Sequence, residues 1–122
     1  MAREDDVFEG GFGVRRPLRF LAHRLDLDDG QVAALARILD ELKTERAQAA
    51  VDGRRSLSEF ADAVSGDAFE ATKAQAAGDR RVQSAERLRA AVLKALQEIH
   101  SLLNADQRTR FAYLIRTGAL AM

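Results

Sequence analysis

The segment Leu27-Asp28-Asp29-Gly30-Gln31 opens a long amphipathic stretch of this chain, and Leu103-Asn104-Ala105-Asp106-Gln107 opens the last one. Both segments read leucine, a capping residue, two spacers and glutamine. Asp28 or Asn104 can accept a hydrogen bond from an amide of the first helical turn. The glutamine three residues later can return a hydrogen bond to the amide of the cap, which makes a capping box. The repeated segment therefore predicts two helix starts.

Apolar residues recur at helical spacing around these two starts. Their pattern predicts a short helix over residues 14–25, long helices over 28–65 and 68–102, and a short final helix over 105–116. Gly118 is a suitable stop for the last one. No segment alternates with a period of two, so we expect no sheet. The predicted fold class is all-α, with helices in the order short, long, long, short.

The break between the long helices predicts a helical hairpin. Large apolar residues are sparse at 46–53 and at 76–82, where small and charged residues take their place, and we expect these two segments to face each other. Two helices cannot cover their own apolar stripe. We therefore expect an antiparallel, cradle-like homodimer with two-fold symmetry. Residues 1–13, with glycines and clustered acids, are expected to form a flexible arm, and residues 14–122 a single helical domain.

Composition excludes several classes of function. The 122 residues carry 19 basic and 19 acidic side chains, a balance that argues against a nucleic-acid binder, and the absence of cysteine excludes disulfides and thiol catalysis. No apolar run approaches the ~20 residues that a membrane span needs. Residues 1–13 show no export signal. We expect a cytoplasmic protein for the chain as written, and a periplasmic one if an export signal has been removed.

The sequence gives little support to catalysis. It contains no nucleophile elbow, no phosphate-binding glycine loop and no HExxH pattern, so we expect neither an enzyme nor a cofactor. Its two histidines, His23 and His100, could join Glu98 in a weak zinc or nickel site if the first short helix packs beside the second long one. A partly buried structural histidine is the alternative.

Arginines are the more informative side chains. Those of residues 14–25 (Arg15, Arg16, Arg19 and Arg24) lie mostly off the apolar face, as a solvated side or as a surface for a membrane or a partner. On the long helices, arginines alternate with apolar residues in a pattern that can hold unfolded chains loosely. The alternative is ordinary pairing with acids on the helix surface. The candidate client-binding residues are Arg46, Arg54, Arg55, Leu57, Phe60, Phe69, Arg80 and Arg81.

The two capping segments resemble the LTxxQ motifs of the Spy/CpxP family of stress-response chaperones and their metal-sensing relatives. Gln31 and Gln107 are 76 residues apart, near the separation in that family, and the resemblance covers about residues 14–117. The motif threonine is Asp28 in one copy and Asn104 in the other. The resemblance implies a short-long-long-short helical hairpin, a cradle-shaped antiparallel homodimer, and a concave surface that binds unfolded proteins without ATP.

The resulting expectation is a small homodimer that binds unfolded or partner proteins as an ATP-independent holdase or stress-response adaptor. One alternative is a metal-responsive sensor or regulatory domain, with His23, Glu98 and His100 as ligands. A second alternative is a plain dimerisation module without clients. The caps themselves, with Leu27 and Leu103 in front of them, are expected to be structural.

Overall fold

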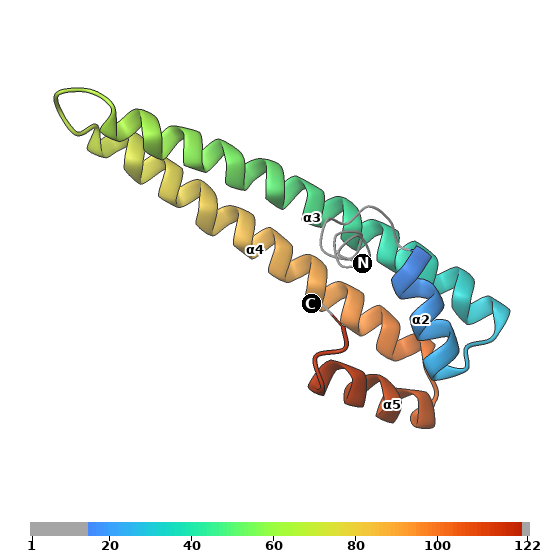
Figure 1. Cartoon of the computed structure of the whole chain (residues 1–122). Helices are drawn as coiled ribbons and strands as arrows, with labels where there is room; N and C mark the ends of the chain where they lie inside the picture. The colour runs from blue at the N-terminus through green and yellow to red at the C-terminus, as the bar shows by residue number, and fades with distance from the viewer. Residues whose placement is uncertain (1–14, 121–122) are drawn as a thin grey trace. The chain divides into compact units, whose positions relative to one another are not determined.

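The computed structural model describes residues 15–120. Four helices and no strand occur in this range: α2 (Arg15–Leu25), α3 (Asp29–Val64), α4 (Ala71–Leu102) and α5 (Ala105–Arg116) (Figure 1). The predicted all-α class and helix order are confirmed. The arm predicted over residues 1–13 lies outside the described residues.

The described residues divide into two compact units, with the boundary inside both long helices. Unit 1 comprises α2, residues 29–44 of α3, residues 92–102 of α4, and α5. Unit 2 comprises residues 45–91, which are the rest of α3, the loop after it and the rest of α4.

Unit 1 contains a hydrophobic core to which each of its four helices contributes one apolar stripe. Leu25 of α2 and Leu35 of α3 are each 1% exposed, and α2 packs directly on α5. Burying a leucine of this size contributes about 2 kcal/mol. The buried core residues are Leu21, Leu25, Leu35, Ile38, Ala95, Ile99, Leu103, Phe111 and Leu114.

Both short helices of unit 1 end in a left-handed residue that completes a Schellman motif. Asp26 has φ 58°, and the amide of Leu27 donates to the carbonyl of Ala22 over 3.0 Å. Gly118 has φ 79°, and the amide of Ala119 donates to Leu114 over 3.1 Å, so the predicted stop at Gly118 is confirmed. The left-handed conformation satisfies the last carbonyls of each helix.

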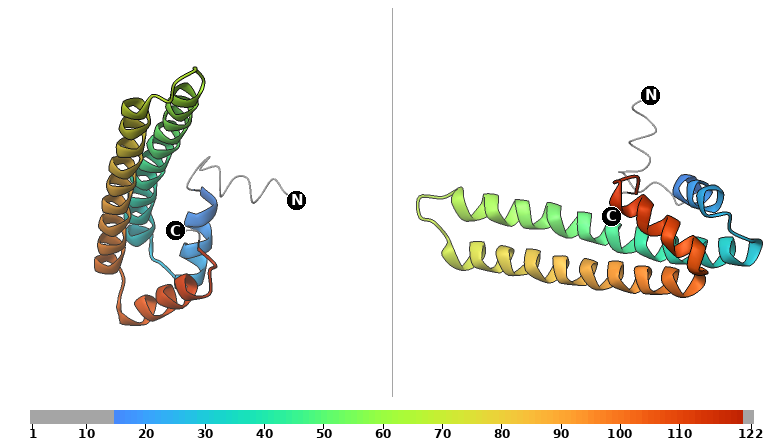
Figure 2. Two further views of the ribbon diagram at one scale, coloured as in Figure 1. Left: turned by 90° about the vertical axis from the view of Figure 1, so that its left-hand side faces the viewer. Right: turned by 90° about the horizontal axis from the view of Figure 1, so that it is seen from below.

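Unit 2 is a helical hairpin whose two helices run antiparallel and side by side (Figure 2). Small side chains fill the space between them: Ser56, Ala63 and Ala77 are each 0% exposed. Because small residues face inward at helical spacing, the two backbones approach closely without a large apolar core. The contact surface between the two helices of unit 2 is therefore made of small side chains.

The expected register of the hairpin is wrong. Segment 46–53 does not pair with 76–82, since Asp52 hydrogen-bonds to Ser84 and to Arg87. The physical reason is the length of the loop between the two helices. α4 begins at Ala71, not at 68, so the loop spans 65–70 and shifts the second helix along the first.

Candidate functional site

Both predicted capping segments form their reciprocal hydrogen bonds. The amide of Gln31 donates to Oδ1 of Asp28 over 2.8 Å, and the amide of Asp28 donates to Oε1 of Gln31 over 3.0 Å. The amides of Gln107 and Asn104 make the same exchange, at 2.9 Å in each direction. The carboxylate of Asp28 and the side-chain amide of Asn104 thus cap their helices in place of the threonine that the resemblance implies.

The two glutamines also bind each other. Nε2 of Gln31 donates to Oε1 of Gln107 over 2.9 Å, and Nε2 of Gln107 donates to Oε1 of Gln31 over 3.2 Å. Gln31 further donates to the carbonyl of Leu102, and Gln107 to that of Leu25. This pair therefore joins the ends of α2 and α4 to the starts of α3 and α5. We call these two glutamines and their caps the glutamine junction.

The glutamine junction is partly shielded from water. Gln107 is 4% exposed and Gln31 is half-buried. Leu103 is 3% exposed in the core of unit 1, and Leu27 packs against the same core. Buried amide groups are costly unless they are hydrogen-bonded, and here every amide group of the pair has partners. The junction therefore holds four helix ends of unit 1 together through hydrogen bonds.

Two ion pairs join α3 to α4 on one flank of unit 2, which we call the ionic flank. Nη2 of Arg80 lies 2.9 Å from Oε2 of Glu59, and a second hydrogen bond runs from Nε to Oε1 over 3.0 Å. Nη2 of Arg87 lies 2.8 Å from Oδ2 of Asp52, which also accepts from Ser84.

The pKa of the Asp52 carboxyl group lies below its ordinary value. The hydrogen bond from Gln48 lowers the pKa of Asp52 most, followed by that from Ser84, and the hydrogen bond and charge of Arg87 lower it further. Burial acts in the opposite direction. Asp52 is therefore held as a carboxylate between the two helices.

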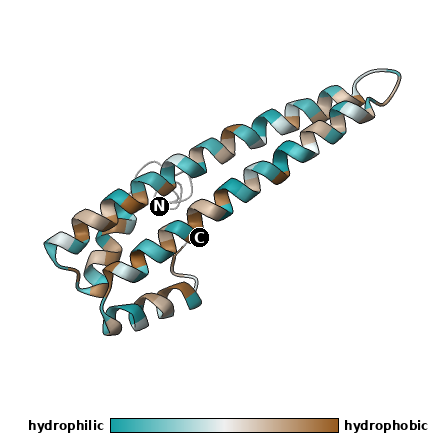
Figure 3. Cartoon of the chain, turned by 180° about the vertical axis from the view of Figure 1, so that it is seen from behind, coloured by the Kyte–Doolittle hydropathy of each residue, from teal (hydrophilic) through white to brown (hydrophobic). Residues whose placement is uncertain are grey.

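The opposite side of α3 is apolar and open to water. At ~100° per residue, Leu57 lies ~140° around the helix from Asp52, and Val64 lies equally far from Glu59. Leu57 is 61% exposed, Val64 is 67% exposed, and Phe60 between them is half-buried. We call these three residues the apolar flank. Figure 3 shows apolar and polar turns alternating along both long helices.

The eight candidate client-binding residues do not share one surface. By helical position Arg46, Leu57 and Phe60 lie on one side of α3, whereas Arg55 belongs to the ionic flank with Asp52 and Glu59. Arg80 is bound to Glu59 in two hydrogen bonds.

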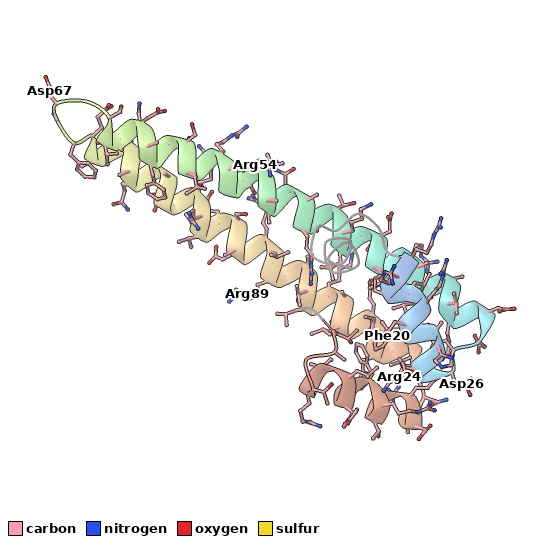
Figure 4. The ribbon with its side chains drawn as sticks, viewed as in Figure 1. Phe20, Arg24, Asp26, Arg54, Asp67 and Arg89 are labelled. Atoms are coloured by element: carbon pink, nitrogen blue, oxygen red, sulfur yellow. The ribbon has the colours of Figure 1, made fainter. Side chains whose placement is uncertain are left out.

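The remaining candidates are spread over the rest of unit 2. Arg54 is exposed and extends away from the helix pair, as does Arg89, which was not in the candidate set (Figure 4). Arg81 is exposed one residue after Arg80, and Phe69 is 64% exposed in the loop. The structure therefore keeps Leu57 and Phe60 together and separates Arg55 and Arg80 from them.

The alternative ligand set for a metal is not assembled. His23 is exposed on α2, His100 is exposed on α4, and Glu98 is half-buried two residues before it. Within residues 15–120, no three His, Cys, Asp or Glu side chains are grouped so that they could hold a metal ion.

Glu98 instead lines an open surface pocket of about 610 Å³ in unit 1, together with Arg37, Glu41 and Lys94. Nζ of Lys94 lies 3.8 Å from Oε1 of Glu41. The charges of the two bases and the two acids of this pocket sum to zero.

Among residues 15–120, each helix is too short or too polar to span a membrane.

Three features are not among the candidates from sequence. The first is the contact between the two glutamines, for which the repetition of one motif was the available signal. The second is the pair Asp52 and Ser84, although Asp52 and Ser56 lie four residues apart on one side of the same helix. Val64 is the third omission, with its 67% exposure on the apolar flank.

Comparison with known proteins shows a family match. The family model described as LTXXQ motif family protein matches residues 14–114. Neither the curated proteins nor the solved structures contain a significant match to the chain.

Proposed function

Because the chain belongs to the LTXXQ motif family, which includes Spy and CpxP, we propose that it binds unfolded proteins without ATP and delays their aggregation. The observation that supports this proposal is the apolar flank of unit 2. Leu57 and Val64 are more than half exposed, and Phe60 lies between them. Large apolar side chains grouped at helical spacing on a surface are typical of a protein-binding site.

Charge is the second part of the proposed site. Arg54 and Arg81 are exposed on the two helices of unit 2, and no ion pair between described residues involves either. Arginine attracts acidic segments over roughly 10 Å at moderate salt, and the apolar flank then holds them by contact. The client class is therefore an unfolded, acidic polypeptide with apolar side chains.

Light scattering tests this proposal directly. The test protein is an acidic one that aggregates when its disulfides are reduced; the chain contains no cysteine for the reductant to act on. At equal molar amounts and without ATP, we expect a several-fold slower rise in scattering. Unchanged aggregation at low salt would contradict the proposal.

Two variants locate the site. Leu57→Ser with Val64→Ser removes the two most exposed side chains of the apolar flank without touching the space between the helices, and we expect most of the protection to be lost. Leu93→Ser is the matched control, since Leu93 is 58% exposed in unit 1. Equal losses in both would place the activity elsewhere.

A second proposal concerns assembly. We propose that two copies associate as an antiparallel homodimer, because two helices with small residues between them leave large apolar side chains uncovered. Sedimentation velocity between 1 and 100 µM (a range set by ordinary dimer affinities, about micromolar) should detect the mass of two chains. A folded monomer throughout that range would refute the dimer and leave the client-binding test standing.

A further inference from the structure

Helix α2 presents a basic stripe to water. The helix carries four arginines and no acid, and Arg15, Arg19 and His23 follow one another at four-residue spacing. At ~100° per residue, these three side chains lie within ~80° of one another around the helix, and all three are exposed. Leu21 and Leu25 leave the helix on the other side and are buried in the core of unit 1. We call the three exposed residues the α2 stripe.

The loop that follows α3 is the acidic end of unit 2. Asp62 lies in the last turn of α3 and Asp67 lies in the loop, and both are exposed. The amide of Glu70 donates to the carbonyl of Ala63 over 3.0 Å, which ties the two ends of the loop together. Figure 4 shows Asp67 pointing away from the helix pair. Residues 62–70 hold three acids and no base, and we call them the acidic tip.

The acidic tip has charge and apolar surface to offer a partner. No ion pair between described residues involves Asp62 or Asp67, whereas Glu70 is 3.6 Å from Nζ of Lys73. Phe69 is 64% exposed beside these acids, and the face of an aromatic ring attracts a guanidinium group. The tip is therefore complementary in charge and in chemistry to a stripe of arginines.

We propose that the acidic tip of one copy of the chain docks on the α2 stripe of a second copy. The carboxylates of Asp62 and Asp67 bind the guanidinium groups of Arg15 and Arg19, and the ring of Phe69 covers their apolar stems. The inference rests on the homodimer proposed above and names the contact that sets its direction.

Charge explains why the two copies run in opposite directions. Under two-fold symmetry the contact forms twice, once at each end of the dimer. An antiparallel pair brings the acidic tip of each copy to the basic helix of the other. A parallel pair sets α2 beside α2 and tip beside tip, where like charges repel each other.

Charge reversal on either side tests the contact. Arg15→Glu with Arg19→Glu makes the stripe acidic, and Asp62→Lys with Asp67→Lys makes the tip basic. Each variant alone places like charges together at both contacts, so at low salt we expect its dimer to be about tenfold weaker than that of the unchanged chain in sedimentation velocity. In an equimolar mixture of the two variants, both contacts again join opposite charges. We expect this mixture to form dimers with one chain of each kind.

Two controls separate the contact from the net charge of the chain. Arg55→Glu with Arg89→Glu changes the charge as much as the stripe variant does and should leave the dimer intact. Asp79→Lys with Glu86→Lys has the net charge of the tip variant, and its mixture with the stripe variant should associate less than the mixture of stripe and tip variants. All four positions are exposed, and circular dichroism checks that each variant keeps its helices.

An engineered disulfide gives an independent readout, since the chain contains no cysteine. Ala68→Cys places a thiol in the tip and His23→Cys places one in the stripe, and both positions are exposed. When the two variants are mixed and oxidised, we expect disulfides between them to form several-fold faster than disulfides between identical chains. Equal rates would contradict the docking.

The outcomes also separate this contact from the homodimer itself. If both charge-reversed variants form dimers as stable as those of the unchanged chain, the contact is refuted and the homodimer stands. If each variant dissociates but their mixture does not associate, the reversed charges act within one chain, and the proposal is refuted. An unchanged chain that remains monomeric throughout refutes both the homodimer and the contact.

Discussion

Gln31 and Gln107 exchange two side-chain hydrogen bonds, at 2.9 and 3.2 Å, while each also caps its own helix. The two residues are 76 positions apart in the chain. Each side-chain amide therefore binds the cap of its own helix and also links two parts of the chain that are distant in sequence. This arrangement explains why glutamine, with a donor and an acceptor on one planar group, occupies both positions.

The first prediction concerns the energy of this pair. Gln107→Ala should lower the free energy of unfolding by about 3 kcal/mol, since it removes the side-chain donor to the carbonyl of Leu25 and the acceptor of one of the two hydrogen bonds that Nε2 of Gln31 donates. Gln31→Ala should cost less, because Gln31 is only half-buried. Urea unfolding of both single variants and the double variant should give a coupling of about 1 kcal/mol. Gln97→Ala, on an exposed residue, is the control, and strict additivity would contradict the coupling.

The second prediction tests whether Asp28 and Asn104 act only as helix caps, a role that the threonine of the motif could also fill. Asp28→Ala and Asn104→Ala should each destabilise the protein by about 1 kcal/mol, because an amide of the first turn loses its acceptor. Asp28→Thr and Asn104→Thr should retain most of the stability, since a hydroxyl oxygen can accept the same bond. Thermal unfolding followed by circular dichroism measures both. Threonine variants as unstable as the alanine variants would mean that the carboxylate and the amide do more than cap.

The third prediction concerns the small residues inside unit 2. Ala77→Leu should destabilise the hairpin by about 2 kcal/mol, because Ala77 is fully buried where the helices approach. Ala76→Leu places the same side chain on an exposed neighbouring position and should be nearly neutral. Hydrogen exchange of residues 45–91 detects the local loss of protection. Equal protection in the two variants would show that the helices are not closely packed here.

The fourth prediction is a dependence on acid pH. In the folded chain the pKa of Asp52 lies below its ordinary value of about 3.9, so the unfolded chain binds this proton more readily. The contribution of Asp52 to stability is therefore complete above pH ~4 and disappears as the pH falls through the lowered pKa. Asp52→Asn should flatten this part of the curve of urea midpoint against pH.

The helices and their starts were predictable from sequence because they depend on local physics. A cap and a glutamine three residues later lie within one turn, and apolar spacing marks the buried face of each helix. The start of α4 was not predictable from the same signals. Asp67 and Glu70 have the spacing of a capping box and predict a start at residue 68, but the helix begins only at Ala71.

The sequence by itself determined the all-α fold, the order of the helices and the two capping boxes, since each rests on contacts over three or four residues. Only the tertiary structure decided that Gln31 meets Gln107 and that Arg80 is bound to Glu59. These relationships depend on the register between two helices. A turn only a few residues longer shifts that register, and no local pattern in either helix records it.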